Sequence, residues 1–127
     1  MAFTALSGVE NREIMECVNL AFSDYPMPIH FTEDSLQGFF EASDVDKELS
    51  FAAYAGGTMV GFILNSANLY QGEPVAFDAG TGVIPAFRGQ GVFSGLYAFA
   101  EQALRRRGIR KYYLEVLQQN ERAKEIL

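Results

Sequence analysis

Apolar residues recur along the chain with two different periods, and the change of period divides the chain into helices and strands. Recurrence every three or four positions is typical of an amphipathic helix, whereas runs of β-branched and aromatic residues are typical of strands. The helices predicted in this way cover about 10–24, 32–43 and 92–107, followed by a short one that Asn120 would cap. The predicted strands cover 2–6, 49–55, 58–69, 75–83 and 109–117.

Glycine and proline residues mark where these segments end and indicate how they connect. Gly56-Gly57 predicts a tight hairpin and Gln71-Gly72-Glu73-Pro74 predicts the next turn, so the three middle strands form an antiparallel meander. The strand–helix–strand segment that follows is a βαβ unit, whose two strands are parallel. Ser7 and Glu10 have the spacing of a capping box at the start of the first helix. We therefore expect one α/β domain over residues 1–127 with a mixed sheet.

The composition is that of an ordinary globular domain, with 49% hydrophobic and 20% charged residues. A net charge of −6 argues against general binding to nucleic acid or to anionic membranes. No apolar run is long enough to cross a membrane and the N-terminus lacks the pattern of a signal peptide, so we expect a cytoplasmic protein. Cys17 is the single cysteine and His30 the single histidine, which argues against an internal disulfide and against a metal site.

The candidate chemistry lies in one glycine-rich segment, Gly80 to Phe93, which links the strand over 75–83 to the helix over 92–107. Glycines let the backbone turn and expose its N–H groups, and a helix N-terminus favours an anion, so this arrangement suits a phosphate group. The basic residues bunched within 105–111 have two interpretations. They complement the helix dipole at the end of that helix, or they attract an anionic ligand such as a nucleotide phosphate.

Two familiar phosphate loops fit this segment poorly. A Walker A loop requires Gly-Lys followed by Ser or Thr, which the chain lacks. A dinucleotide fingerprint requires Gly-x-Gly-x-x-Gly directly after a strand, followed about 20 residues later by an acid. Gly89 to Ser94 nearly satisfies this pattern and Glu115 follows on the next strand, but five residues separate the predicted strand from Gly89. A dinucleotide-binding domain therefore stays an alternative.

The segment Arg88-Gly89-Gln90-Gly91-Val92-Phe93 resembles the Arg/Gln-x-x-Gly-x-Gly/Ala motif of the GCN5-related N-acetyltransferase (GNAT) superfamily. The residues that lead into it, Val83 to Gly89, resemble the V-x-P-x-[YF]-R-G sequence of that superfamily. Leu114-Glu115-Val116, followed by Asn120 and Ala123, resembles its L-E-V…N-x-x-A segment, and the order of the predicted elements matches as well. The resemblance covers nearly the whole chain.

The resemblance implies an N-acetyltransferase that takes an acetyl group from acetyl-CoA, a co-substrate used without a metal, and passes it to an amine by direct attack. It implies that main-chain N–H groups of the loop hold the pyrophosphate and that the end of the preceding strand holds the pantetheine arm. It also implies that an asparagine near the last helix meets the cofactor. The residues at those positions are Arg88, Gly89, Gln90, Gly91, Val92, Phe93 and Ser94 in the loop, Thr81, Gly82 and Val83 in the strand, and Asn120.

Three departures from the superfamily pattern bear on this expectation. Phe93 occupies the last glycine or alanine position of the motif, so its side chain must point away from the phosphate, and we expect it in the core. Leu127 stands where many members carry a tyrosine that protonates the departing thiolate, so that role is vacant or filled elsewhere, with Tyr112 and Tyr113 as candidates. The last strands of the superfamily fold are missing, so we expect that the chain is incomplete or that another subunit, as in a homodimer, completes the sheet.

Catalysis requires a base that removes a proton from the attacking amine and donors for the developing oxyanion. We expect the base on the strand before the glycines, at Asp78, with Glu115 as a second candidate. Tyr25 and His30 lie in a proline-stiffened connection, and we interpret them as a wall of the acceptor pocket. The acceptor is a small-molecule or peptide amine that the sequence does not identify. A CoA-binding sensor or scaffold without turnover is the alternative function.

Overall fold

The computed structural model describes residues 1–27, 29–116 and 120–125, with side chains described up to residue 114. Its centre is a six-stranded sheet in which neighbouring strands follow the order of the chain. The strands are β1 (Ala2–Ala5), β2 (Phe51–Ala55), β3 (Thr58–Tyr70), β4 (Glu73–Val83), β5 (Lys111–Val116) and β6 (Asn120–Glu125). The helices are α1 (Asn11–Ala21), α2 (Glu33–Ala42) and α3 (Val92–Arg106), with a short 3-10 turn, η1 (Pro85–Phe87).

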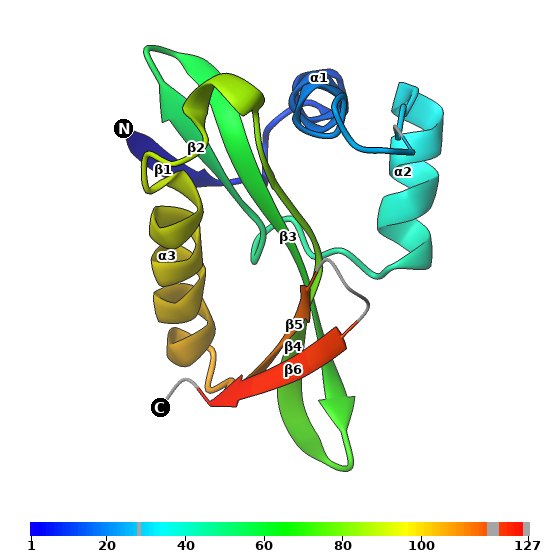
Figure 1. Ribbon diagram of the computed structural model, residues 1–127. Coiled ribbons are helices and arrows are strands. Elements are labelled where there is room, and N and C mark those ends of the chain that lie inside the picture. Colours follow the sequence, from blue (N-terminus) through cyan, green and yellow to red (C-terminus); the bar gives the residue numbers. More distant parts are fainter. Residues whose placement is uncertain (28, 117–119, 126–127) are drawn as a thin grey trace.

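The sheet separates the helices into two layers. α3 lies on one face, and α1 and α2 lie on the other (Figure 1). Each helix buries the apolar stripe that its sequence period predicts, and burial of that stripe is the main stabilising contribution of such a helix. The fully or nearly buried residues are Ile14, Cys17, Val18 and Ala21 in α1, Leu36 and Phe40 in α2, and Val92, Leu96, Ala100 and Leu104 in α3.

The predicted sheet topology is confirmed. β1 to β4 pair antiparallel with their neighbours, and β4 and β5 pair parallel after the crossover through α3. Two hairpins close the meander: Gly56 and Gly57 have φ of 57° and 82°, and Gln71 and Gly72 have φ of 53° and 80°. The turn at Gln71 needs only these two residues, so Glu73 and Pro74 belong to β4 rather than to the predicted turn.

The start of α1 differs from the prediction. Glu10 is the N-cap residue of α1 and no side chain caps it, so the predicted capping box between Ser7 and Glu10 does not form. Gly8 has a φ of 86° and the N–H of Val9 donates to the carbonyl oxygen of Leu6, which makes a turn where the box was expected. The helix therefore begins only after this turn, at Asn11.

The predicted final helix is wrong, because Asn120–Glu125 form the strand β6. β6 pairs antiparallel along the whole of β5, from Val116 opposite Asn120 to Lys111 opposite Glu125 (Figure 1). A helix of two turns is marginal without tertiary packing. As a strand, the same residues satisfy the hydrogen-bonding edge that β5 would otherwise leave open.

Candidate functional site

The glycine loop connects β4 to α3 by way of η1. Pro85 starts η1, and Arg88 then returns to an extended backbone conformation. Gly89 and Gly91 have φ of 76° and 81°, in the left-handed region that favours glycine. A Cβ atom added at either glycine would meet no atom within 4 Å. These glycines are therefore needed for their backbone conformation and not for lack of space around them.

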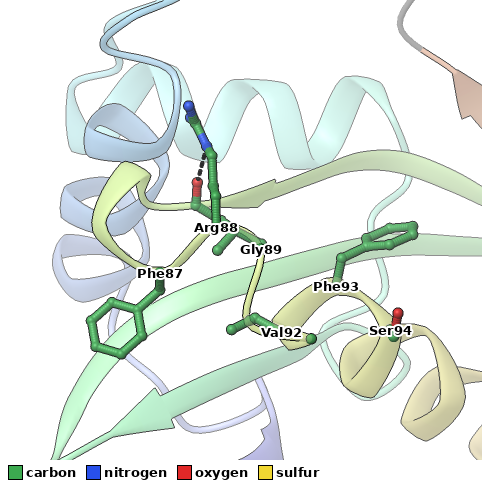
Figure 2. Close-up of a pocket in the computed structure, with 8 residues that line it drawn as sticks. Phe87, Arg88, Gly89, Val92, Phe93 and Ser94 are labelled. Atoms are coloured by element: carbon green, nitrogen blue, oxygen red, sulfur yellow. Dashed lines mark hydrogen bonds between the residues drawn. The ribbon is translucent and has the colours of Figure 1, made fainter.

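A hollow of about 260 Å³ lies over this loop and the first turn of α3 (Figure 2). Gly91 is the N-cap of α3 and has no side chain to cap the helix. The first N–H groups of a helix have no acceptor within the helix and form a ready site for an anion. The loop is thus chemically suited to hold a phosphate. The residues that line the hollow are Val83, Phe87, Arg88, Gly89, Gly91, Val92, Phe93 and Ser94.

The side chain of Phe93 is 47% exposed, so the expectation that it lies in the core is wrong. Its ring stacks on Tyr97, one helical turn further along α3, at a centroid distance of 6.2 Å. This orientation carries the ring away from Val92 and Gly89 (Figure 2). Phe93 nevertheless lines the hollow, so whether its ring leaves room for a phosphate stays a prediction.

β4 and β5 pair over only three residues and then diverge. Their recorded pairing ends at Phe77 opposite Tyr113, although β4 continues to Val83 and β5 to Val116. β4 keeps its antiparallel pairing with β3 up to Val83 opposite Gly61. Among the described residues, no strand pairs with the second edge of β4 beyond Phe77, so this edge is open just before the glycine loop. An open strand edge of this kind can pair with an extended ligand.

A β-bulge lies at the start of the open part of β4. Asn65 of β3 is opposite Asp78 and Leu64 is opposite Gly80, so Ala79 is the extra residue. Asp78 is 7% exposed and stabilises the bulge: one of its carboxylate oxygens accepts from the N–H of Gly80 at 2.9 Å, and the other accepts from the hydroxyl of Thr81 at 2.7 Å. Asp78, the predicted base, is thus one of the residues that hold the bulge in β4.

A buried polar network lies beside the bulge. The hydroxyl of Tyr112 donates to the side-chain oxygen of Asn65, whose amide group donates to the carbonyl oxygen of Leu49 at 2.7 Å. Ser50 accepts from the N–H of Asn65 at 2.8 Å. Burial, and then the charge of Asp78, raise the pKa of Tyr112 far above its ordinary value. Tyr112 is fully buried and its hydroxyl donates to Asn65, so the network provides a partner for this buried polar group.

The guanidinium group of Arg88 does not face the hollow. Its Nη1 donates to Oδ2 of Asp24 at 2.6 Å, and its Nη2 donates to Oδ1 of the same carboxylate at 3.1 Å and to the carbonyl oxygen of Ala21 at 2.7 Å. Its Nε donates to the carbonyl oxygen of Val83 at 3.1 Å. The hydrogen bond from Arg88 lowers the pKa of Asp24 and raises that of Arg88. Figure 2 shows the side chain directed away from Val92 and Ser94.

The other predicted site residues lie around this loop or outside the described part of the structure. Tyr25 follows Asp24 and its ring packs against Phe22 at 4.8 Å, half buried, whereas His30 is exposed. The backbone of Glu115 lies in the part of β5 beyond its pairing with β4, and Asn120 begins β6, but the side chains of both lie outside the described residues, as does Leu127.

The basic residues at the end of α3 lie at the far end of the helix from the glycine loop, about 20 Å away for a helix of this length. Arg105 contacts Glu101 at 3.4 Å and Arg107 contacts Glu48 at 3.7 Å. Of the two interpretations, complementing the helix dipole fits this position. Within the described residues, no helix could span a membrane and no group of three side chains could hold a metal ion.

Comparisons with known proteins point to one family. The sequence pattern of the acetyltransferase (GNAT) family matches residues 14–126, while no curated protein sequence matches the chain. A GNAT family acetyltransferase from Brucella melitensis in complex with acetyl-CoA has a TM-score of 0.71 and 21% identity, over 91% of this chain and 75% of that one.

Two further solved structures show the same likeness. The ribosomal-protein-S18-alanine N-acetyltransferase from Escherichia coli has a TM-score of 0.66 and 18% identity, over 91% of this chain and 66% of that one. An aminoglycoside acetyltransferase from an uncultured soil metagenomic sample has a TM-score of 0.65 and 16% identity, over 91% and 75%. At such identities the structural likeness establishes the fold. Because the family pattern also spans most of the sequence, the chain belongs to the acetyltransferase (GNAT) family.

Proposed function

We propose that the chain is an acetyl-CoA-dependent N-acetyltransferase in which an amine attacks the donor directly, and that residues 1–127 act as one domain. The observation that carries this proposal is the divergence of β4 from β5 immediately before the glycine loop. An extended backbone edge there leads into the N-terminus of a helix. A ligand with a hydrogen-bonding arm and a phosphate end fits both parts, and CoA is built in this way.

On the donor side, we propose that main-chain groups from Arg88 to Ser94 hold the pyrophosphate. The hollow over the loop, the left-handed Gly89 and Gly91 and the uncapped N-terminus of α3 support this assignment. The pantetheine arm would pair with the open edge of β4 at Thr81, Gly82 and Val83, as an added strand does. Asn120 stays a proposed contact with the cofactor.

Acetyl-CoA supplies a thioester carbonyl group that a neutral amine can attack. The protein must therefore take a proton from the amine, and N–H groups near the bulge of β4 are suited to bind the developing oxyanion. We propose Asp78 and Glu115 as the bases. Both oxygens of Asp78 accept hydrogen bonds, one from Gly80 and one from Thr81, so we propose that a water molecule carries the proton from the amine to this carboxylate.

On the acceptor side, we propose a small-molecule or peptide amine that contacts Tyr25 and His30. Similar solved structures include the NatC complex bound to Gag peptide and CoA, the ribosomal-protein-S18-alanine enzyme and the aminoglycoside enzyme. These names cover peptide, protein and small-molecule amines, so the fold by itself does not select among them.

The test measures binding and turnover separately. Acetyl-CoA and CoA should each raise the melting temperature of the protein, and free CoA should be released when an amine is added. The panel contains a peptide with a free N-terminal alanine, a peptide with an internal lysine and blocked termini, and an aminoglycoside. Binding without turnover on any amine would favour the sensor or scaffold. If neither acetyl-CoA nor CoA changed the melting temperature, the proposal would be refuted.

A further inference from the structure

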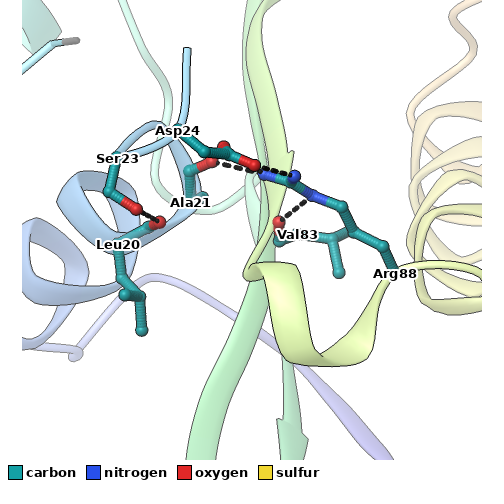
Figure 3. Close-up of polar contacts among 6 residues, drawn as sticks. All are labelled: Leu20, Ala21, Ser23, Asp24, Val83 and Arg88. Atoms are coloured by element: carbon teal, nitrogen blue, oxygen red, sulfur yellow. Dashed lines mark hydrogen bonds and ion pairs between the residues drawn. The ribbon is translucent and has the colours of Figure 1, made fainter.

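Arg88 connects two parts of the molecule that are far apart in the sequence. Its guanidinium group donates to Asp24 and to the carbonyl oxygen of Ala21, both at the end of α1, and to the carbonyl oxygen of Val83 at the end of β4 (Figure 3). We call these contacts the Arg88 clamp. Four of the donor contacts that the planar fork offers are thus made to protein acceptors.

The clamp also fits the electrostatics of α1. The carbonyl groups of the last turn of a helix accept no hydrogen bond from within the helix, so a nearby cation stabilises that end of the helix. The carbonyl oxygen of Ala21 is such a group, and α1 has no basic residue in its own last turn. Arg88 supplies that charge from the glycine loop. The bidentate pair with Asp24 fixes the plane of the guanidinium group as well as its position.

Two hydrogen bonds fix the other end of the connection between α1 and α2. The side chain of Asn19 accepts from the N–H of Phe31 at 2.7 Å and donates to the carbonyl oxygen of the same residue at 2.9 Å. The segment that carries Tyr25 and His30 therefore lies between two attachments, Asp24 on Arg88 and Phe31 on Asn19. We call the described residues 25–27 and 29–31 the acceptor loop, a name that rests on the proposed function above.

We propose that Arg88 is a positioning residue, whose side chain fixes the acceptor loop against the glycine loop instead of binding the phosphate of the donor. Arg88 lines the hollow and its guanidinium group contacts Asp24 and the end of α1, so one residue belongs to both sites. Whatever orders the glycine loop also orders the start of the acceptor loop. Binding of CoA and the position of Tyr25 are therefore coupled through this side chain.

Variants of Arg88 and of its partner Asp24 test whether the side chain of Arg88 positions the acceptor loop or binds the phosphate. Asp24→Ala removes the carboxylate, and Arg88→Ala removes the guanidinium group. The Kd for CoA changes to the same extent in both variants, within about twofold of each other, because the side chain of Arg88 acts through Asp24 and not through the phosphate. The KM for the amine of the panel with the fastest turnover rises by about 5- to 20-fold, with a smaller change in kcat. The KM of the double variant for the amine is no higher than that of either single variant, because both substitutions remove the same interaction.

Hydrogen–deuterium exchange tests the coupling without any acceptor. CoA should slow amide exchange over residues 22–31 in the wild type, and this slowing should be lost in Asp24→Ala and in Arg88→Ala. Glu33→Ala is the matched control, because it breaks the exposed pair between Arg12 and Glu33 at the other end of α1, where the two side chains are 3.5 Å apart. The control should keep both the slowing by CoA and the KM of the wild type.

Three results would overturn the inference. The first is a loss of CoA affinity of more than about tenfold in Arg88→Ala but not in Asp24→Ala, which would make Arg88 a phosphate ligand. The second is an unchanged KM for the amine in both variants, and the third is unchanged slowing of exchange by CoA. Wild-type protein that does not bind CoA would refute the proposed function, and the inference with it. Wild-type binding with any of the three results refutes the inference alone.

Discussion

Gly91 and Gly108 are a matched pair of positions, and variants of the two distinguish a role in phosphate binding from a role in helix geometry alone. They flank α3 at its two ends, have φ of 81° and 79°, and an added Cβ would meet no atom within 4 Å at either one. Replacing either with valine therefore places the new Cβ in open space. The cost is that of holding a branched L-residue in the left-handed region, about 1–2 kcal/mol. For a chain of 127 residues this lowers the melting temperature by roughly 3–8 °C.

The two variants should differ once CoA is added. A ligand at one hundred times its Kd stabilises the native state by about 2.7 kcal/mol, which raises the melting temperature by roughly 8–12 °C. The wild type and Gly108→Val should show this rise. Gly91→Val should not, because Gly91 lines the hollow at the N-terminus of α3, where the new side chain would take the place of the phosphate. Thermal melts with and without CoA, followed by calorimetric titration, measure both effects. A full rise in Gly91→Val would refute the placement of the pyrophosphate.

Three further predictions concern stability and reactivity. Burial raises the pKa of Cys17 to about 12, so at pH 8 its thiolate is about a thousandfold rarer than for a thiol with the ordinary value of 9.0. The thiol reagent DTNB should therefore react slowly with the native protein and rapidly with the protein unfolded in urea. Fast labelling of the native protein would contradict the burial of Cys17. Tyr112→Phe leaves the buried oxygen of Asn65 without its donor and should cost about 1–3 kcal/mol in urea unfolding, whereas no loss would mean that the network is not stabilising. Gly82→Ala places a Cβ 2.7 Å from the buried ring of Phe62 and should cost about 1–3 kcal/mol in urea unfolding, whereas unchanged stability would contradict the close packing at this position.

Periodicity was sufficient to predict most of the fold because burial follows it closely. α3 has one apolar face and buries it, whereas β3 has helices on both faces of its sheet and is buried at eight consecutive residues. The ends of elements were less predictable. Gly8 forms a turn where a capping box had the right spacing, and the residues after Asn120 pair with β5 because a neighbouring strand edge outweighs a weak local preference for helix.

The site was predictable at the level of the backbone and less so at the level of side chains. Two glycines before an amphipathic helix are enough to indicate the left-handed turns at Gly89 and Gly91. Nothing in the sequence near Arg88 indicates that its partner is Asp24, 64 positions earlier. The bulge at Ala79 is equally hidden, because it depends on the register between two strands and not on the residues of either one.

The open edge of β4 and the loop that follows it present peptide groups, which every residue carries, to whatever lies beside them. A surface of this kind places few demands on side-chain identity beyond two glycines and the start of a helix. Substitutions elsewhere can therefore accumulate over evolutionary time while the hydrogen-bonding surface persists. Sequence variation along such a surface is therefore limited mainly by the backbone conformation that each position has to adopt.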